Sequence, residues 1–202
     1  MERINEPSEL QRKFSSLYPE LVLASSSPNR RGLLECGGSI VHAFSPEIDE
    51  STDEKDPVKA MLSIAGRKLE AYMKSASFRP DLPAIAADTL VLIDNQLLGK
   101  PRDEEDAERI LRTLSGRSQI VYTATGLYLP EKGAEIFIDS AEVVFYDLSD
   151  EEIRNYISTG EWNGAAGGYR LQKTGYKLVE KIIGDWTTVV GLPLEALNAR
   201  LS

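Results

Sequence analysis

The sequence predicts an α/β fold in which helices flank a mixed β-sheet. Short apolar runs of strand length alternate with longer segments that have the 3.6-residue period of amphipathic helices. Helix-capping and turn-forming residues separate these segments, and the chain has no internal repeat. With 202 residues, 42% of them hydrophobic, the chain suits one sizeable domain or two small lobes that share a sheet.

The first expected element is a short buried strand at 21–24, an apolar run that stops at three serines. Pro28 then begins a helix that ends at Gly37-Gly38, because proline is favoured in the first turn and glycine past the last. A strand-like run follows at 40–44. The residues expected on the buried face of a second helix, 57–75, are Val58, Leu62, Ala65, Leu69 and Tyr72.

The middle of the chain predicts a strand and a hairpin. Residues 83–87 form a buried strand that we expect to end at Asp88-Thr89, before a further apolar run at 90–93. A turn at Asp94-Asn95 returns the chain as a hairpin partner at 96–98. The next elements expected are a helix at 103–114, strands at 118–128 and 134–145, and a helix that Ser149 caps and Gly160 ends.

Both ends of the chain are expected to differ from this regular pattern. Residues 162–169 are rich in glycine and alanine, and carry too few large side chains to pack a core. A short helix at 192–201 closes the chain. Residues 1–18 are interpreted as an N-terminal extension, and 19–202 as the domain.

Composition favours a cytoplasmic protein without a membrane segment. No apolar run approaches the roughly 20 residues that cross a bilayer, and the polar N-terminus lacks a signal region. The single cysteine, Cys36, cannot form an intrachain disulfide, and we interpret it as a small buried hydrophobe. The single histidine, His42, cannot build a multi-histidine metal site and is interpreted as structural.

The formal net charge of −9 argues against a protein that coats nucleic acid, so we expect no stable nucleic-acid binding. It is compatible with a small phosphorylated ligand, because a local cluster of cations can hold one inside an acidic protein. The acidic runs 49–56 and 103–108 contribute most of the surplus, which favours solubility.

The loop from Ser25 to Arg31 is the first candidate for a binding site. It combines hydroxyl groups, the backbone N–H groups of a helix start and two arginines, which together suit a phosphate chain. An ordinary serine cap with solvated arginines explains the same residues.

Asp88 and Thr89 are the second candidate. An acid at the end of an apolar strand lies where an α/β sheet presents groups to a ligand. Asp88 could activate water or hold a metal, and Thr89 could hydrogen-bond a base or a phosphate. A turn-forming aspartate that caps local backbone is an equally good explanation.

Three further charged residues complete the candidate set. Lys100, set between Gly99 and Pro101, and Lys68 could neutralise phosphate or be surface lysines. Glu50 could be a ligand for a hard metal ion, although its acidic neighbours favour a solvated loop. Together with the serine loop and Asp88, these residues suit metal-assisted hydrolysis of a phosphoanhydride.

An ordered series of short blocks resembles the Maf family of nucleotide pyrophosphatases. The blocks lie at 23–30, 87–89, 98–101, 114–116, 156–161, 166–172 and 189–193. The resemblance implies an elongated mixed α/β fold with two lobes around a cleft, similar to the inosine triphosphate pyrophosphatases. It also implies hydrolysis of a nucleoside triphosphate to its monophosphate and pyrophosphate, and a possible homodimer.

The resemblance further implies a role for each candidate residue. Asp88 would be the general base, and Glu50 with Asp88 would hold a divalent cation, Mg²⁺ or Mn²⁺. The residues implied to bind the triphosphate are Ser25, Arg30, Lys68 and Lys100, and those tied to base choice are Asn29, Thr89 and Gln172. Residues 169–172 are similar to the family branch for thymidine and uridine triphosphates, so dTTP and UTP are the expected substrates.

The sequence departs from the family pattern at three places. Asn29 stands at the first of two usual arginines, Gly164-Ala165 replaces an aspartate–lysine pair, and Gln119 replaces a common histidine. The loss of two cations should weaken triphosphate binding or change selectivity. The loss keeps open one alternative, a nucleotide-binding regulator of cell division or septum formation with little turnover. A phosphatase that releases orthophosphate first is a separate alternative.

Overall fold

The computed structural model describes residues 7–94 and 96–200. Its strands are β1 Glu20–Ala24, β2 Ile40–Phe44, β3 Ala84–Ile93, β4 Gln96–Leu98, β5 Ser118–Leu129, β6 Gly133–Phe145 and β7 Val179–Ile183. Its α-helices are α1 Glu9–Leu17, α2 Pro28–Gly37, α3 Pro57–Met73, α4 Glu104–Leu114, α5 Asp150–Ser158, α6 Trp186–Val190 and α7 Leu194–Arg200. Two short 3₁₀ helices are η1 Ala166–Gly168 and η2 Thr174–Leu178.

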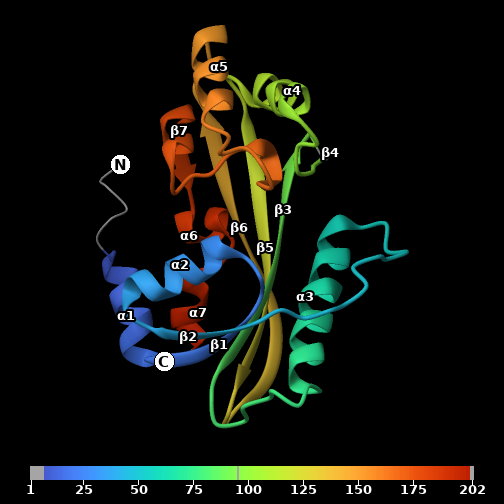
Figure 1. The fold of residues 1–202 in the computed structure, drawn as a ribbon, viewed down its shortest axis with the longest axis vertical. Helices are drawn as coiled ribbons and strands as arrows, with labels where there is room; N and C mark the ends of the chain where they lie inside the picture. Colours follow the sequence, from blue (N-terminus) through green and yellow to red (C-terminus); the bar gives the residue numbers. More distant parts are fainter. Residues whose placement is uncertain (1–6, 95, 201–202) are drawn as a thin grey trace. The chain divides into compact units, whose positions relative to one another are not determined.

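The strands form one mixed sheet in the order β2-β1-β3-β5-β6-β7, with β4 paired to β3 (Figure 1). The strand β1 is parallel to both β2 and β3, whereas the pairs β3–β4 and β6–β7 are antiparallel. Both kinds of pairing occur, and helices accompany the sheet, so the predicted α/β class with a mixed sheet is confirmed.

The chain divides into two compact units. The β1 unit comprises the described residues up to 88, Thr123–Asp139 and the described residues from Gly191 onward. The α4 unit comprises Thr89–Tyr122 and Ser140–Val190. Three strands, β3, β5 and β6, contribute residues to both units.

In the β1 unit, the parallel strands carry a core that α3 covers. Apolar side chains from β1, α3 and the start of β3 form one cluster, which includes Val22, Leu69, Tyr72 and Ala84. The helix comes so close to β5 that a Cβ atom at Gly126 would lie 3.1 Å from the Cβ of Leu69. Figure 1 shows α3 on one side of β3, and α1, α2 and α7 on the other.

The N-terminal helix α1 belongs to this packing. Ser8 and Gln11 form a reciprocal capping box at its start. The side chain of Phe14 is 1% exposed, and the Gln11 amide donates a buried hydrogen bond to the carbonyl of Leu33 in α2. The Asn198 amide of α7 donates to the carbonyl of Leu10. Residues 7–18, predicted as part of an extension, are therefore largely a helix packed on α2 and α7.

In the α4 unit, α4 packs against α5 and η1. Its buried apolar residues are the four predicted ones, Ala107, Ile110, Leu111 and Leu114. Asp103 caps its start and Ser149 caps α5, the latter as predicted. The elements that the sequence did not predict are β7, α6, η1 and η2 here, and α1 in the β1 unit.

The predicted end of a strand at Asp88-Thr89 is wrong, because β3 runs unbroken from Ala84 to Ile93. Ala87 and Leu90 are buried on either side of the two polar residues, which are themselves half-buried. Burial of these flanks keeps the backbone extended, so that only the polar side chains interrupt the apolar pattern.

The prediction that residues 162–169 pack no core is also wrong. The side chains of Trp162 and Tyr169 are 9% and 6% exposed, and the glycines of η1 are buried. At Gly168, whose φ of 73° favours glycine, an added Cβ atom would lie 3.2 Å from the Pro101 ring. Small residues bring the backbone itself into contact with its neighbours, which a count of large side chains misses.

Smaller differences concern single residues. Cys36 is half-buried rather than buried, because Leu33 and Leu34 occupy the inner face of α2. His42 is exposed, and its Nε2 atom lies 2.8 Å from a carboxylate oxygen of Glu20. Residues 1–6 of the predicted extension, Asn95 of the predicted turn and Leu201 of the predicted closing helix lie outside the described residues.

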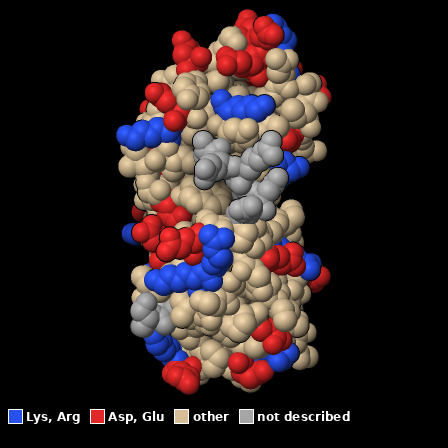
Figure 2. Space-filling model, turned by 90° about the vertical axis from the view of Figure 1, so that its left-hand side faces the viewer, with Lys and Arg blue, Asp and Glu red and all other residues tan. Residues whose placement is uncertain are grey.

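No helix within the described ranges is both long and apolar enough to cross a membrane. The face drawn in Figure 2 carries acidic and basic side chains in small neighbouring groups among uncharged residues. The acidic surplus of the sequence is thus interspersed with cations on this face.

Candidate functional site

Six of the predicted site residues belong to the β1 unit, namely Ser25, Asn29, Arg30, Glu50, Lys68 and Asp88. The strand β1 ends just before Ser25, and its neighbour β3 continues past that point to Asp88. Because Leu23 pairs with Ile85 in a parallel register, Ser25 lies level with Ala87, next to Asp88. The strand that ends here is therefore β1. Its carboxyl end lies beside the polar residues Asp88 and Thr89 of β3, where an α/β sheet presents groups to a ligand.

Lys68 of α3 joins the two predicted carboxylates. Its Nζ atom lies 2.8 Å from Oδ1 of Asp88 and 2.9 Å from Oε1 of Glu50. The side chain of Lys68 is 12% exposed, that of Asp88 23% and that of Glu50 57%. An ion pair that is partly shielded from water is less screened than a surface pair. One ammonium group thus bridges Glu50 and Asp88.

Arg67, which was not predicted as a site residue, fixes the backbone on both sides of Glu50. Its guanidinium donates to the carbonyl oxygens of Asp49 and Ser51, the latter at 3.2 Å. The Asp49 carboxylate in turn accepts the backbone N–H of Ser51 at 2.8 Å. Residues 45–54 have no regular secondary structure, so these bonds replace a sheet or helix ladder in placing Glu50. In the sequence, the position of Arg67 directly before Lys68 was the signal from which its place in the site could have been predicted.

Arg30 of α2 is held by two partners at the carboxyl end of β1. Its Nη1 atom donates to the Ser25 hydroxyl at 2.9 Å, and its Nε atom donates to the Gly191 carbonyl at 2.7 Å. Loss of hydration lowers the pKa of Arg30 to about 10, against the opposing effects of Asp88 and Glu50. The guanidinium is still charged at neutral pH and remains electrostatically coupled to both carboxylates.

Gly191 was not predicted as a site residue. Its φ of 109° lies in the left-handed region that favours glycine, and its carbonyl oxygen accepts the Arg30 hydrogen bond. The sequence signal was the block Val189–Pro193, which the family resemblance included without assigning it a role.

The start of α2 completes this side of the site. Ser27 is the N-cap residue of α2, and its backbone N–H donates to the Ser25 hydroxyl at 3.2 Å. Asn29 lies in the first helical turn and is half-buried. The first backbone N–H groups of a helix have no partner within the helix and favour an anion. Ser25, Arg30 and the helix start therefore suit phosphate oxygens.

The other three predicted residues, Thr89, Lys100 and Gln172, belong to the α4 unit. Thr89 follows Asp88 directly in β3, Lys100 is exposed, and Gln172 is half-buried. Within the described part of the chain, the buried amide nitrogen of Gln172 has no hydrogen-bond partner. It is a buried donor that a ligand could satisfy.

Buried polar groups hold the segment that carries Gln172. The Gln119 amide donates to the Tyr169 hydroxyl at 2.7 Å, and the Arg170 backbone N–H donates to the Tyr156 hydroxyl at 2.9 Å. Burial raises the pKa of Tyr156 to about 12 and that of Tyr169 further, so both phenols stay neutral. Gln119, one of the departures from the family pattern, thus has a partner at the start of this segment.

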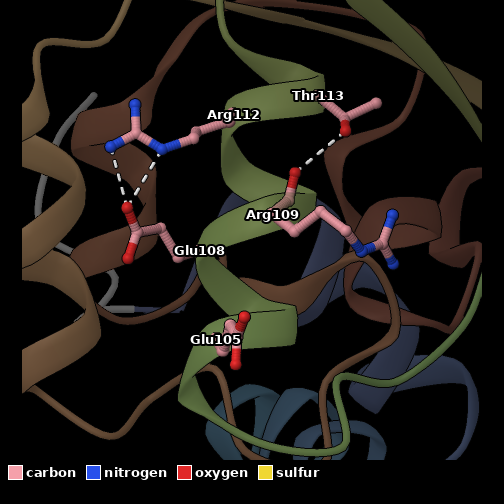
Figure 3. Close-up of a pocket in the computed structure, with 5 residues that line it drawn as sticks. All are labelled: Glu105, Glu108, Arg109, Arg112 and Thr113. Carbon is pink, nitrogen blue, oxygen red and sulfur yellow. Dashed lines mark hydrogen bonds and ion pairs between the residues drawn. The ribbon is translucent and has the colours of Figure 1, made fainter.

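A depression of about 540 Å³ on the surface of α4 contains none of the predicted site residues. Figure 3 shows its lining, Glu105, Glu108, Arg109, Arg112 and Thr113. Arg112 donates to Glu108 at 2.8 and 3.0 Å, and Thr113 donates to the carbonyl of Arg109 at 2.9 Å. Arg112 and Glu108 thus pair with each other, and the Arg109 guanidinium donates to Asp106 in the same helix, which is typical of a solvated helix face.

The donor set of the β1 unit fits a hard divalent cation. Glu50 and Asp88 each present a carboxylate oxygen to the same Nζ atom, and carboxylates are the ligands that Mg²⁺ prefers. The described residues contain no group of three or more His, Cys, Asp or Glu side chains placed to hold a metal ion. The fit is therefore to a cation that two carboxylates would hold and that other ligands would complete, an arrangement common for Mg²⁺.

Two solved structures are similar at low TM-scores. A nucleoside-triphosphatase (dITP/XTP pyrophosphatase) from Mycobacterium abscessus has a TM-score of 0.37 and 19% identity, and covers 64% of this chain and 75% of its own. The Ham1 protein of Staphylococcus aureus has a TM-score of 0.41 and 14% identity, with coverages of 63% and 72%. The fold assignment rests instead on the sheet topology given above.

Sequence comparison gives much closer relatives. A dTTP/UTP pyrophosphatase from Caldanaerobacter subterraneus subsp. tengcongensis is 41% identical over 88% of this chain and 86% of its own length. A dTTP/UTP pyrophosphatase from Pyrococcus furiosus is 42% identical, with coverages of 87% and 90%. Residues 20–202 match the family described as Maf-like protein. The match covers nearly the whole chain, and the chain belongs to the Maf-like protein family.

Proposed function

We propose that this chain is a nucleoside triphosphate pyrophosphatase that hydrolyses dTTP and UTP. The observation that carries the proposal is the Lys68-bridged pair of Glu50 and Asp88 beside the Ser25–Arg30 contact. Carboxylates for water and metal thereby lie next to groups that suit a phosphate chain. The relatives named dTTP/UTP pyrophosphatase, about 40% identical over most of the chain, support the reaction and the two substrates.

The reaction consumes one water and one phosphoanhydride bond. The water oxygen attacks the α-phosphorus, and the bond from that phosphorus to the oxygen bridging it to the β-phosphorus breaks. Pyrophosphate departs as the leaving group, and the nucleoside monophosphate is the second product. Asp88 accepts the proton of the attacking water as general base. One of its oxygens accepts the Lys68 hydrogen bond, which orients the carboxylate for this step.

The cations of the site stabilise the charge that grows on the departing pyrophosphate. Arg30, oriented by Ser25 and Gly191, binds the triphosphate oxygens as a fixed fork, and Lys68 and Lys100 add mobile positive charge. A divalent cation, Mg²⁺ or Mn²⁺, held by Glu50 and Asp88 would neutralise phosphate charge and polarise the α-phosphoryl group. A donor that is already held in place, as Arg30 is, lowers the barrier because it need not rearrange during the reaction.

Base choice is assigned to Gln172, with Thr89 and Asn29. The buried amide of Gln172 carries a donor and an acceptor, which complement the adjacent O4 and N3–H groups of thymine and uracil. A base that leaves the amide donor unsatisfied loses binding energy, because an unpaired buried polar group is costly.

The cytoplasmic location and the homodimer stay predictions.

The proposal is tested by product analysis with a panel of nucleoside triphosphates and Mg²⁺ or Mn²⁺. We expect pyrophosphate and a monophosphate, with dTTP and UTP preferred. Asp88→Asn should lower kcat at least roughly 100-fold, since it removes the base. Asp81→Asn, an exposed aspartate of the same unit paired with Arg79, is the matched control and should retain activity.

Two outcomes contradict the proposal in different ways. Orthophosphate as the first product would indicate a phosphatase. Nucleotide binding without turnover would favour the regulator of cell division.

A further inference from the structure

The Nζ atom of Lys68 lies where the two carboxylates of the site converge. It contacts Oδ1 of Asp88 and Oε1 of Glu50 at hydrogen-bond distance, and its side chain is mostly buried. These are the same carboxylate groups that fit a divalent cation. An ammonium group and a divalent cation repel each other strongly at such short range, so they compete for these oxygens.

We propose that Lys68 is the resident cation of the substrate-free enzyme, and that it keeps Glu50 and Asp88 from binding a divalent cation until the nucleotide arrives. The ammonium group then moves from the carboxylates to the triphosphate. This inference rests on the proposed function, because it assigns the order in which metal and nucleotide enter the same site.

The charges of the site support this order. Two carboxylates face one ammonium group, and Arg30 is electrostatically coupled to both carboxylates. Two negative and two positive charges give a locally neutral site, which attracts a divalent cation weakly. A triphosphate brings several negative charges and restores the attraction. Metal and nucleotide therefore bind cooperatively, and each raises the affinity for the other by the same factor.

The structure also indicates which group moves. Arg67 binds the backbone carbonyls on both sides of Glu50, and Asp88 lies within the continuous strand β3. Both carboxylates are thus fixed through their backbone. Lysine has a flexible four-carbon stem and three rotatable donors, so rotation of the Lys68 side chain alone can release the oxygens.

A purely structural ion pair predicts different behaviour. In that case, removing the lysine would leave two partly buried carboxylates without a partner, which lowers stability. It would not by itself create a stronger metal site at the position of the lysine. The affinity for a metal ion in the absence of nucleotide therefore distinguishes the two roles.

The test is a titration of the nucleotide-free, full-length protein with Mn²⁺, followed by calorimetry and by the electron paramagnetic resonance signal of free Mn²⁺. We expect Lys68→Met to bind Mn²⁺ at least about tenfold more tightly than the wild type, because it removes a positive charge in contact with both ligands. Lys74→Met is the matched control. Lys74 lies just past the end of α3, is exposed, and pairs only with Glu70 among the described residues, so we expect wild-type affinity.

Two further variants define the site. Lys68→Arg keeps the charge and should keep the weak affinity of the wild type. Glu50→Gln combined with Lys68→Met should abolish the gain. With an α,β-imido nucleoside triphosphate present, the wild type should gain Mn²⁺ affinity, whereas Lys68→Met should gain much less.

An unchanged or weaker Mn²⁺ affinity of Lys68→Met, in a protein that still unfolds cooperatively, would overturn the inference. If that variant does not fold, Lys68→Gln replaces it under the same criterion. The two proposals fail separately. Metal-dependent turnover by the wild type without a gain in Lys68→Met refutes only the resident-cation role, and a gain without turnover of any nucleotide refutes only the proposed reaction.

Discussion

A backbone carbonyl, together with the Ser25 hydroxyl, fixes the direction of the Arg30 side chain. The Nε atom of Arg30 donates to Gly191 at 2.7 Å, and Gly191 presents its carbonyl from a left-handed conformation with φ of 109°. A residue with a Cβ atom adopts that conformation only with strain. The glycine carbonyl therefore positions the arginine.

Gly191→Ala should lower kcat/KM roughly tenfold, because it misdirects Arg30 and so weakens its contact with the triphosphate. Gly133→Ala is the matched control, since Gly133 also has a positive φ, 82°, and an added Cβ atom there has no neighbour within 4 Å. Steady-state kinetics with dTTP measures both variants.

The effect of Gly191→Ala should be largely absent when Arg30 is already replaced by lysine, because lysine cannot make both hydrogen bonds that Arg30 makes to Ser25 and Gly191. Non-additivity of this kind shows that the two residues act through one contact. An equal fall of kcat/KM in Gly133→Ala, or full additivity with Arg30→Lys, would exclude the positioning role.

At the residue scale, the sequence identified the side chains that carry charge but not the groups that orient them. Asp88, Glu50 and Lys68 were predicted, and they are in contact. Arg67 and Gly191 were missed, because a hydrogen bond to a distant backbone carbonyl leaves no pattern in the local sequence. Their roles depend on which loops the fold brings together.

At the element scale, α4 depends on one buried carboxylate. The side chain of Asp106 accepts hydrogen bonds from Arg109 and Arg102, and these bonds lower its pKa to about 2. A carboxyl group whose pKa is lower in the folded state stabilises that state above its unfolded pKa of about 4. This contribution is lost as the pH falls from about 4 to 2.

Asp106→Asn should therefore lower the free energy of unfolding at pH 7, and the difference from the wild type should shrink towards zero near pH 2. Urea unfolding at the two pH values measures it. Glu105→Gln, a charge change at the neighbouring position in α4, is the control and should show no comparable pH dependence. A deficit of the same size at both pH values would mean that ionisation of Asp106 is not the cause.

Most elements were predictable because their signals are local. The periodicity of α4, the start of α2 at Pro28, the cap at Ser149, and the hairpin of β3 and β4 all follow from neighbouring residues. The continuity of β3 through Asp88 was not predictable, since a polar pair in an apolar run also marks a strand end. Tertiary burial of the flanking residues decides between the two.

At the scale of the whole molecule, the N-terminal helix α1 packs against α2 and against α7 near the other end of the chain. The family match starts at residue 20, yet α1 lies before it and buries Phe14 against the β1 unit. A helix at the start of a chain contributes to stability when its apolar face is covered.

Phe14→Ala should lower the free energy of unfolding by about 3–5 kcal/mol, the usual effect of truncating a buried aromatic side chain. Leu17→Ala, in the same helix, is the control because Leu17 is 42% exposed, and it should change stability much less. Equal, small effects in denaturant unfolding would show that residues 7–18 behave as a dispensable extension.

The whole chain is acidic, with a net charge of −9, but its proposed site gathers Arg30, Lys68 and the start of α2. The net charge therefore predicted the acidic character of the surface but not the charge of the ligand. A few buried or oriented cations outweigh distant acidic residues at short range. The family resemblance supplied the reaction, and the geometry of the β1 unit supports where it occurs.

The most direct test of the proposed reaction is hydrolysis of dTTP in water enriched in ¹⁸O, with mass spectrometry of both products. Attack of water on the α-phosphorus places one ¹⁸O atom in the monophosphate and none in the pyrophosphate, and we expect this result. Label in pyrophosphate would place the attack on the β-phosphorus, and labelled orthophosphate with a diphosphate would place it on the γ-phosphorus. Either of the last two results would contradict the assignment of this chain as a nucleotide pyrophosphatase acting at the α-phosphorus.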